Sequence, residues 1–241
     1  MQNIKSDNWN ICDIEKAIRK LKNNKSRDPH GIVSDIFKDE CIGQDLKRAL
    51  VYFYNIIKKE LFIPNFLTWS NITSIYKKSG SKEDMDNQRG IFWLTVFKKI
   101  LDNLLHCEFY EDIHQQMSDS NIGGRKHKMA KDHLFMLYGM INDVVHGNAP
   151  ESDVIAVDIE KAFDKLNLRE TMNDIVDNLP DKKGNDKLAL LYMSNKITNI
   201  AIKTPFGLTE RSEYKEVVTQ GGGWGSISCS IPWINWARKA L

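Results

Sequence analysis

Residues 154–164 hold the strongest candidate for catalytic chemistry in the sequence, because a short apolar run leads directly into carboxylates. Four apolar residues at 154–157 are followed by Asp158. A carboxylate at the end of a buried strand suits a hard divalent cation, since the backbone fixes the oxygen while the strand end faces solvent. Asp is also a common helix N-cap, so Asp158 as the cap of a following helix is an alternative of equal weight.

The glycine-rich segment at residues 219–225 is a second candidate site. Its sequence is Thr-Gln-Gly-Gly-Gly-Trp-Gly, and so many glycines allow a backbone to come very close to a flat or phosphorylated ligand. The segment lacks the Lys-Ser/Thr of a P-loop and the GxGxxG spacing of a dinucleotide fold. A purely structural turn is the more common explanation of such a segment.

Cationic side chains form a third candidate site, at Lys77, Lys78, Lys82 and Arg89. Arg binds phosphate as a bidentate fork and Lys binds it as a point charge. A second cationic loop lies at residues 123–128. For any single lysine, an ordinary solvated surface loop is the more common explanation.

Amphipathic helices must position these residues. The apolar spacing predicts a helix capped by Asp13, with Ile14, Ala17, Ile18 and Leu21 on its buried side. The same spacing predicts helices over residues 46–57, 97–105 and 168–176. It also predicts a helix from about Asp132 that buries Leu134, Leu137, Ile141 and Val144 or Val145.

Strands are predicted where β-branched and apolar residues cluster, at residues 72–76, 154–158, 197–203 and 214–219. The last two are joined through the Thr-Pro-Phe-Gly turn at residues 204–207. Helices come first and a strand, helices and a hairpin follow, which indicates an α+β fold.

Composition limits the class of protein. The chain has 241 residues and a mass of 27.8 kDa, and 41% of the residues are hydrophobic, which excludes a disordered or fibrous protein. Residues 1–135 carry 22 basic and 18 acidic residues (+4), and residues 136–241 carry 12 and 14 (−2). This change in net charge from the first part of the chain to the second suits a polyanion-binding surface beside a metal centre. Four widely spaced cysteines predict reduced, buried thiols in an intracellular protein, and no signal peptide or membrane span is predicted.

Several short motifs follow one another in a fixed order. They are Lys-Ser-Arg-Asp-Pro-His-Gly-Ile at 25–32, Lys77 through Arg89-Gly90-Ile91, Ser-Asn-Ile-Gly-Gly-Arg at 120–125, Asp158 with Ala-Phe-Asp at 162–164, and Gln-Gly at 220–221 with Cys-Ser at 229–230. This series resembles the reverse transcriptase domain of non-LTR (LINE-like) retrotransposons, over nearly the whole chain. Linked motifs in order are far more specific than any one of them.

The resemblance implies a right-hand polymerase with helices packed on an antiparallel palm sheet. Residues 1–150 would form the fingers and the fingers/palm helices, and residues 151–241 the first part of the palm. The rest of the palm and the thumb are expected to be absent. The family's second metal motif, two adjacent aspartates, has no counterpart, since the sequence contains no Asp-Asp pair.

The resemblance also implies a two-metal centre. Asp158 matches the first catalytic carboxylate and, with the carbonyl of Ile159, would hold Mg²⁺. Phe163 matches the aromatic steric gate that excludes a ribose 2′-hydroxyl.

Further residues match nucleotide contacts in the family. Lys77 and Arg89 match fingers residues that contact the incoming triphosphate or the template. Gln220 and Gly221 match the loop that lies against the nascent base pair. Trp93 departs from the pattern, because the family carries a smaller aliphatic residue there.

These implications describe a fragment of an RNA-directed DNA polymerase that is inactive by itself. Its partners would be an RNA template, a DNA primer and dNTPs, its location nuclear or cytoplasmic, and no membrane would be involved. A non-catalytic nucleic-acid-binding remnant of a degenerate or domesticated element is the main alternative. An unrelated α+β protein with coincidental motifs is a third.

Overall fold

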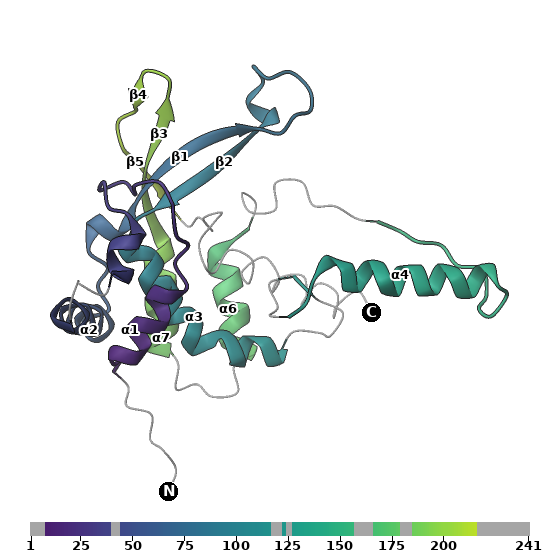
Figure 1. The fold of residues 1–241 in the computed structure, drawn as a ribbon, viewed down its shortest axis with the longest axis horizontal. Helices are drawn as coiled ribbons and strands as arrows, with labels where there is room; N and C mark the ends of the chain where they lie inside the picture. The colour runs from purple at the N-terminus through teal and green to yellow at the C-terminus, as the bar shows by residue number, and fades with distance from the viewer. Residues whose placement is uncertain are drawn as a thin grey trace, which may run out of the picture.

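The computed structural model describes residues 8–39, 44–116, 122–123, 127–156, 166–178 and 185–215. Most of its helices gather into one body, the strands rise from that body as two hairpins, and one helix projects to the side (Figure 1). Helices and a mixed sheet together agree with the predicted α+β class in its coarse form.

The first helix, α1 (Ile11–Arg19), begins with a capping box at Asn10. The Asn10 side chain accepts from the backbone N–H of Asp13, and the Asp13 carboxylate accepts from the N–H of Asn10. The predicted cap at Asp13 is therefore wrong, because Asp13 is the third residue of the helix and Asn10 is its cap. Ile14 and Ala17 are fully buried, as predicted.

In the helical body, α2 (Gln44–Glu60) and α3 (Val96–Gln116) pack against α1, α7 (Asn185–Lys196) packs against α3, and α6 (Leu168–Asn178) packs against α7. The body also contains the short 3-10 turns η1 (Ser34–Lys38) and η2 (Asn65–Thr68). Most residues of the predicted apolar stripes are buried: Leu50, Tyr54 and Ile57 in α2, and Ile100, Leu101, Leu104 and Leu105 in α3. Leu46, Phe53 and Phe97 of the same stripes are half-buried. The buried side chains join Leu168, Leu190 and Leu191 of α6 and α7 in one hydrophobic core.

The sheet has the strand order β2-β1-β3-β4, with β5 also paired to β3. Its strands are β1 (Trp69–Tyr76), β2 (Gln88–Leu94), β3 (Ile197–Thr204), β4 (Gly207–Leu208) and β5 (Ser212–Lys215); η3 (Met85–Asn87) lies between β1 and β2. β1 and β2 form an antiparallel hairpin, but β1 and β3 are parallel. The prediction of an antiparallel sheet is wrong for this central pair. The chain between the two strands passes through α3 and α7, and such a crossover returns a strand in the parallel direction.

Two strand predictions fail in part. Residues 154–156 belong to no strand, and Val154 and Ile155 are 67% and 84% exposed. Residues 157 and 158 lie outside the described residues. An apolar run becomes a buried strand only where a neighbouring strand pairs with it, and no described strand pairs with this one. The strand expected at 214–219 begins earlier, as β5, and residues 216–219 lie outside the described residues.

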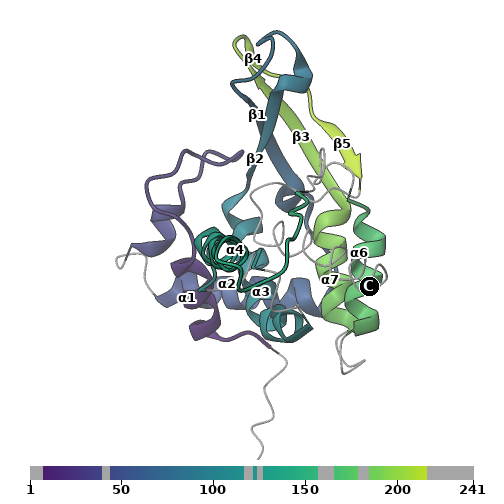
Figure 2. The same cartoon turned by 90° about the vertical axis from the view of Figure 1, so that its right-hand side faces the viewer.

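The projecting helix is α4 (Ala130–Val145) (Figure 1). The predicted helix is confirmed, but its predicted burial is wrong. None of the predicted residues is buried: Leu134, Ile141 and Val145 are exposed, and Leu137 and Val144 are half-buried. Figure 2, turned by 90°, shows α4 end-on, in front of the body. An apolar stripe predicts a face that could be buried, whereas actual burial needs a second surface against it.

The cysteine prediction also fails where it can be checked. Cys12 and Cys107 are exposed, although the sequence predicted buried thiols. Lys20 Nζ donates to Cys107 Sγ at 3.1 Å, so this thiol lies on a polar surface between α1 and α3. Cys41 and Cys229 lie outside the described residues.

Candidate nucleic-acid interface

The hairpin of β1 and β2 brings Lys77 and Arg89 to one face of the sheet. Arg89 lies directly opposite Ile75, and directly opposite residues of an antiparallel pair point to the same face. Lys77 follows Ile75 by two residues, and its N–H still donates to the carbonyl of Asn87 at 2.8 Å. Residues two apart on a strand share a face. Two cations that are twelve positions apart in the sequence therefore lie near each other.

Hydrogen bonds fix the loop between these two residues. Lys77 Nζ donates to the carbonyl of Asp86 at 2.8 Å, and Tyr76 Oη donates to the carbonyl of Gly80 at 2.7 Å. Asn87 Nδ2 donates to the carbonyl of Ser81 at 2.9 Å. Gly80 has φ +71°, and a Cβ there would lie 2.5 Å from Asn87 Nδ2. A side chain at this position would be strained by the positive φ and would displace the Asn87 amide, so glycine is favoured here.

The predicted basic character of this loop does not hold for the whole loop. Lys77, Lys78 and Lys82 are followed closely by three acidic side chains, at Glu83, Asp84 and Asp86. All are exposed. The loop is therefore close to neutral, and the net positive charge lies below it on the strands.

The two faces of the sheet differ in charge. The pairing register places on one face, which we call the charged face, the side chains of Trp69, Asn71, Thr73, Ile75, Arg89, Ile91, Trp93, Asn199, Ala201, Lys203, Leu208, Glu213 and Lys215. The opposite face, the neutral face, carries Ser70, Ile72, Ser74, Tyr76, Gln88, Phe92, Leu94, Thr198, Ile200, Ile202, Thr204, Ser212 and Tyr214. Cations outnumber the single carboxylate on the charged face. That carboxylate, Glu213, is itself paired with Lys215 at 3.7 Å.

Aromatic rings lie between the cations of the charged face. Lys203 Nζ is 5.7 Å from the centroid of the Trp93 ring, and the Arg211 guanidinium is 4.2 Å from that of Trp69. His30, from the loop after α1, stacks on Trp69 with ring centroids 4.8 Å apart. Cations interleaved with aromatic rings are the usual composition of surfaces that bind single-stranded nucleic acid.

Arg211 ties the strands together at the base of this face. Its guanidinium donates to the carbonyls of Ser70 and Asn199, at 3.2 and 3.1 Å, and to Asn71 Oδ1 at 3.0 Å. The first two acceptors belong to the parallel pair β1 and β3. Burial lowers the pKa of Arg211, because its charged form is partly removed from water. Arg211 is thus a structural residue, whereas Arg89 is exposed and its side chain makes no hydrogen bond in the described part of the chain.

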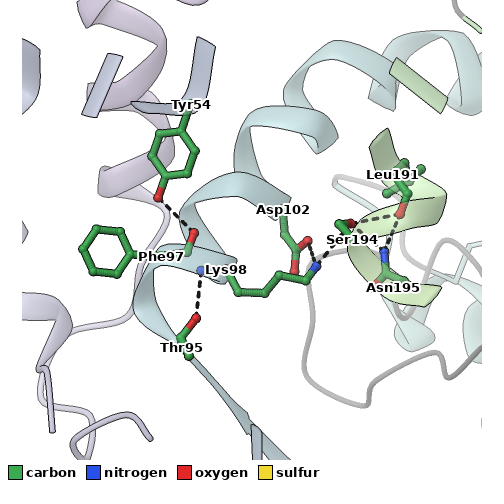
Figure 3. Close-up of polar contacts among 8 residues, drawn as sticks. All are labelled: Tyr54, Thr95, Phe97, Lys98, Asp102, Leu191, Ser194 and Asn195. Atoms are coloured by element: carbon green, nitrogen blue, oxygen red, sulfur yellow. Dashed lines mark hydrogen bonds and ion pairs between the residues drawn. The ribbon is translucent and has the colours of Figure 1, made fainter. Parts of the chain in front are cut away.

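A second polar cluster lies inside the helical body, between α3 and α7 (Figure 3). Lys98 forms an ion pair with Asp102, and its Nζ is 3.4 Å from Ser194 Oγ. All three side chains are buried. On the other side of α3, the Tyr54 hydroxyl donates to the carbonyl of Phe97 at 3.0 Å, and burial, with a smaller contribution from the Asp102 charge, raises the pKa of Tyr54.

This buried cluster is suited to structure rather than to catalysis. The Lys98 ammonium is engaged by the Asp102 carboxylate and donates to Ser194 Oγ, so it does not accept a hydrogen bond from the Ser194 hydroxyl. That hydroxyl donates to the carbonyl of Leu191 at 2.9 Å instead. The cluster joins α3 to α7 through groups that satisfy one another. Sequence reasoning missed it because Lys98 and Asp102, four residues apart on a helix, have the pattern of an ordinary surface ion pair.

The remaining predicted site residues lie outside the described residues. They are Asp158, Ile159, Phe163, Gln220 and Gly221. The predicted magnesium site therefore stays a prediction. Within the residues that the structure describes, no group of three or more His, Cys, Asp or Glu side chains could hold a metal ion.

Two further findings bear on the class of protein. None of the described helices is long and apolar enough to cross a membrane. A search against models of known protein families gives no match for this chain. The hairpin and the charged face are therefore the features on which a function can be based.

Proposed function

We propose that this chain is part of a reverse transcriptase-like domain, in which the β1–β2 hairpin acts as fingers that contact template and nucleotide phosphates. One observation carries the proposal. Lys77 and Arg89 match phosphate-contacting residues of the family, and they share one face of a protruding hairpin. The ordered motif series along the chain supports it.

The geometry suits a polyanionic ligand. Arg89 is exposed, and Lys203 extends the positive charge along β3, next to β1. Each phosphate that a cation neutralises releases condensed counterions, so binding to such a face should weaken steeply as salt rises. The hydrogen bonds of the 77–87 loop hold the hairpin in shape before any ligand arrives, which lowers the entropic cost of binding.

The fingers and palm assignment belongs to this proposal. Residues 1–150 would include the fingers, and residues 151–241 the first part of a palm, with Asp158, the Ile159 carbonyl and Phe163 beside the reacting nucleotide. Mg²⁺ held there would supply the charge stabilisation for nucleotidyl transfer. Because the sequence has no Asp-Asp pair, we expect no template-directed synthesis by this chain alone.

The test is binding of the full chain to a fluorescent RNA template annealed to a DNA primer, measured by anisotropy at several salt concentrations. Arg89→Ala should weaken binding and reduce the slope of log K against log salt by about 1. The matched control, Lys22→Ala, removes an exposed cation from the helical body and should change little. Salt-independent binding, or equal effects of the two variants, would contradict the proposal.

Primer extension on poly(rA)/oligo(dT), with Mg²⁺ or Mn²⁺, tests the second part. We expect incorporation no higher than that of a heat-killed control. Template-dependent incorporation would overturn the claim that this chain is inactive by itself.

A further inference from the structure

We propose that Trp93 is a stacking platform for an unpaired base of a single-stranded nucleic acid. The proposal rests on the proposed function in one respect, namely that the ligand is nucleic acid. It adds a residue that the resemblance does not supply, because Trp93 stands where the family carries a smaller aliphatic side chain. A bulky aromatic residue in place of an aliphatic one needs a physical reason.

The position of Trp93 supports a contact with a ligand. Trp93 lies on the charged face, in line with Ile91 and Arg89 of the same strand. Its side chain is half-buried and lies on β2, the strand at one edge of the described sheet. The indole of Trp93 therefore offers part of its surface to a ligand that runs along β2.

Lys203 places a cation beside this ring. Its Nζ lies 5.7 Å from the Trp93 ring centroid, within the range of a cation–π contact. Lys203 itself is exposed. A nucleic-acid strand whose base stacks on Trp93 would place a phosphate within reach of the Lys203 ammonium. Arg89 lies four residues before Trp93 on the same face of β2. Base stacking and phosphate pairing thus use neighbouring residues, as in sites for single strands.

Asn71 adds a hydrogen-bond donor beside the ring. Asn71 lies directly opposite Trp93, and its Oδ1 accepts from Arg211 Nη2 at 3.0 Å. That bond fixes the orientation of the amide, and Asn71 Nδ2 has no acceptor among the residues that the structure describes. The amide could donate to a carbonyl of a stacked base. A duplex offers no free base face to Trp93, so the site should select single strands over duplexes.

The experiment compares binding of the full chain to a fluorescent 12-nucleotide single strand, to its blunt duplex, and to the same strand with abasic sites. Trp93→Leu should weaken binding of the single strand by about 5- to 150-fold, since stacking contributes about 1–3 kcal/mol per base. It should leave the salt slope unchanged, because no phosphate contact is lost. Binding of the duplex and of the abasic strand should change less than about twofold, because neither offers a stacked base.

Two more variants separate stacking from packing. Trp93→Phe keeps an aromatic ring and should recover most of the affinity. Phe206→Leu removes a fully exposed ring at the turn between β3 and β4 and should leave binding unchanged. Thermal melts check that each variant is folded.

The outcomes distinguish this proposal from the proposed function. If the primer–template duplex binds through Arg89 while Trp93→Leu leaves single-strand binding intact, the stacking platform is wrong and the proposed function stands. The stacking platform is also wrong if Trp93→Leu weakens binding of the abasic strand as much as that of the intact strand. If the wild-type chain binds neither nucleic acid, both proposals fail.

Discussion

Helices α3 and α4 have similar apolar patterns but opposite surroundings. Leu104 of α3 is 1% exposed, whereas Leu134 of α4 is 64% exposed. α3 packs against α1, α7 and η2, while α4 has no comparable packing within the described part of the chain. An i, i+3, i+4 pattern therefore predicts a helix and the side it could bury, but not whether a partner surface exists.

The two helices also differ in the kind of side chain that each buries or exposes. α3 holds the Lys98–Asp102 pair inside the body, with Ser194 of α7 beside it. Polar groups are tolerated there because they are paired. α4 instead exposes apolar side chains to water. The body therefore has a self-consistent interior, and α4 depends on local interactions or on a surface that the described residues do not provide.

The largest expected effect comes from breaking the buried pair. Asp102→Ala leaves Lys98 charged and unpaired in the core and should lower the free energy of unfolding by about 3–5 kcal/mol. Denaturant titration followed by circular dichroism measures it. The double variant Lys98→Met/Asp102→Leu should restore much of the loss, because no uncompensated charge remains.

A surface pair provides the control for this prediction. Asp45 and Arg48 of α2 form an exposed ion pair at 3.3 Å. Asp45→Ala should cost less than about 0.5 kcal/mol, since water and salt screen such pairs. If Asp102→Ala were equally mild, the interior of the body would have to be open to water.

The next effect compares α3 and α4 directly. Leu104→Ala should lower the free energy of unfolding by about 2–5 kcal/mol, through lost burial and the cavity left behind. Leu134→Ala should change it by less than about 0.5 kcal/mol, because its side chain already lies in water. The native chain should also bind a dye that reports exposed apolar surface, and Leu134→Lys together with Ile141→Lys should reduce that signal. Equal costs for the two alanine variants would show that α4 is covered.

The sequence allowed the helices to be predicted better than their contacts. Periodicity correctly predicted α1, α2, α3, α4 and α6, because each carries a local apolar repeat. It assigned no boundaries to β2, whose first residues include Arg89 and Gly90. It could not place β1 parallel to β3, since strand direction depends on the chain path over more than one hundred residues.

The sequence also predicted the residues of the candidate site better than their arrangement in space. Lys77 and Arg89 were selected by resemblance, and only the hairpin register shows that they share a face. The contrast between the charged and neutral faces follows from alternation along strands whose bounds must first be known. The Lys98–Asp102 pair could not be predicted as buried, because its spacing is that of a solvent-exposed pair.

A smaller effect concerns how each helix begins. The N–H of Met129 donates to Asp132 Oδ2 at 2.7 Å at the start of α4, much as that of Asn10 donates to Asp13 Oδ2 at 3.0 Å in α1. Asn10→Ala should cost about 1 kcal/mol of global stability and leave α1 helical, since packing holds it. Asp132→Ala should leave global stability nearly unchanged but raise amide exchange in the first turn of α4, because a helix without packing depends on its caps. Unchanged exchange in α4 would mean that tertiary contacts hold it.

The smallest effect tests an ion pair that joins α1 to α2. Lys47 Nζ lies 2.7 Å from Glu15 Oε1. This hydrogen bond, together with the Lys47 charge, lowers the pKa of Glu15 from its ordinary value of 4.5. A carboxylate whose pKa is lower in the folded state stabilises the fold above its unfolded pKa and loses that contribution as pH falls through the folded pKa.

The wild-type chain should therefore lose stability relative to Glu15→Gln as pH falls from about 4.5 downward, with a constant difference at neutral pH. Urea titrations at pH values from 3 to 7 measure the two curves. Glu83→Gln, in the exposed hairpin loop, should keep the acid-side loss of the wild type. Parallel curves for the wild type and Glu15→Gln across the whole range would show that the pair between α1 and α2 adds nothing to the stability of the body.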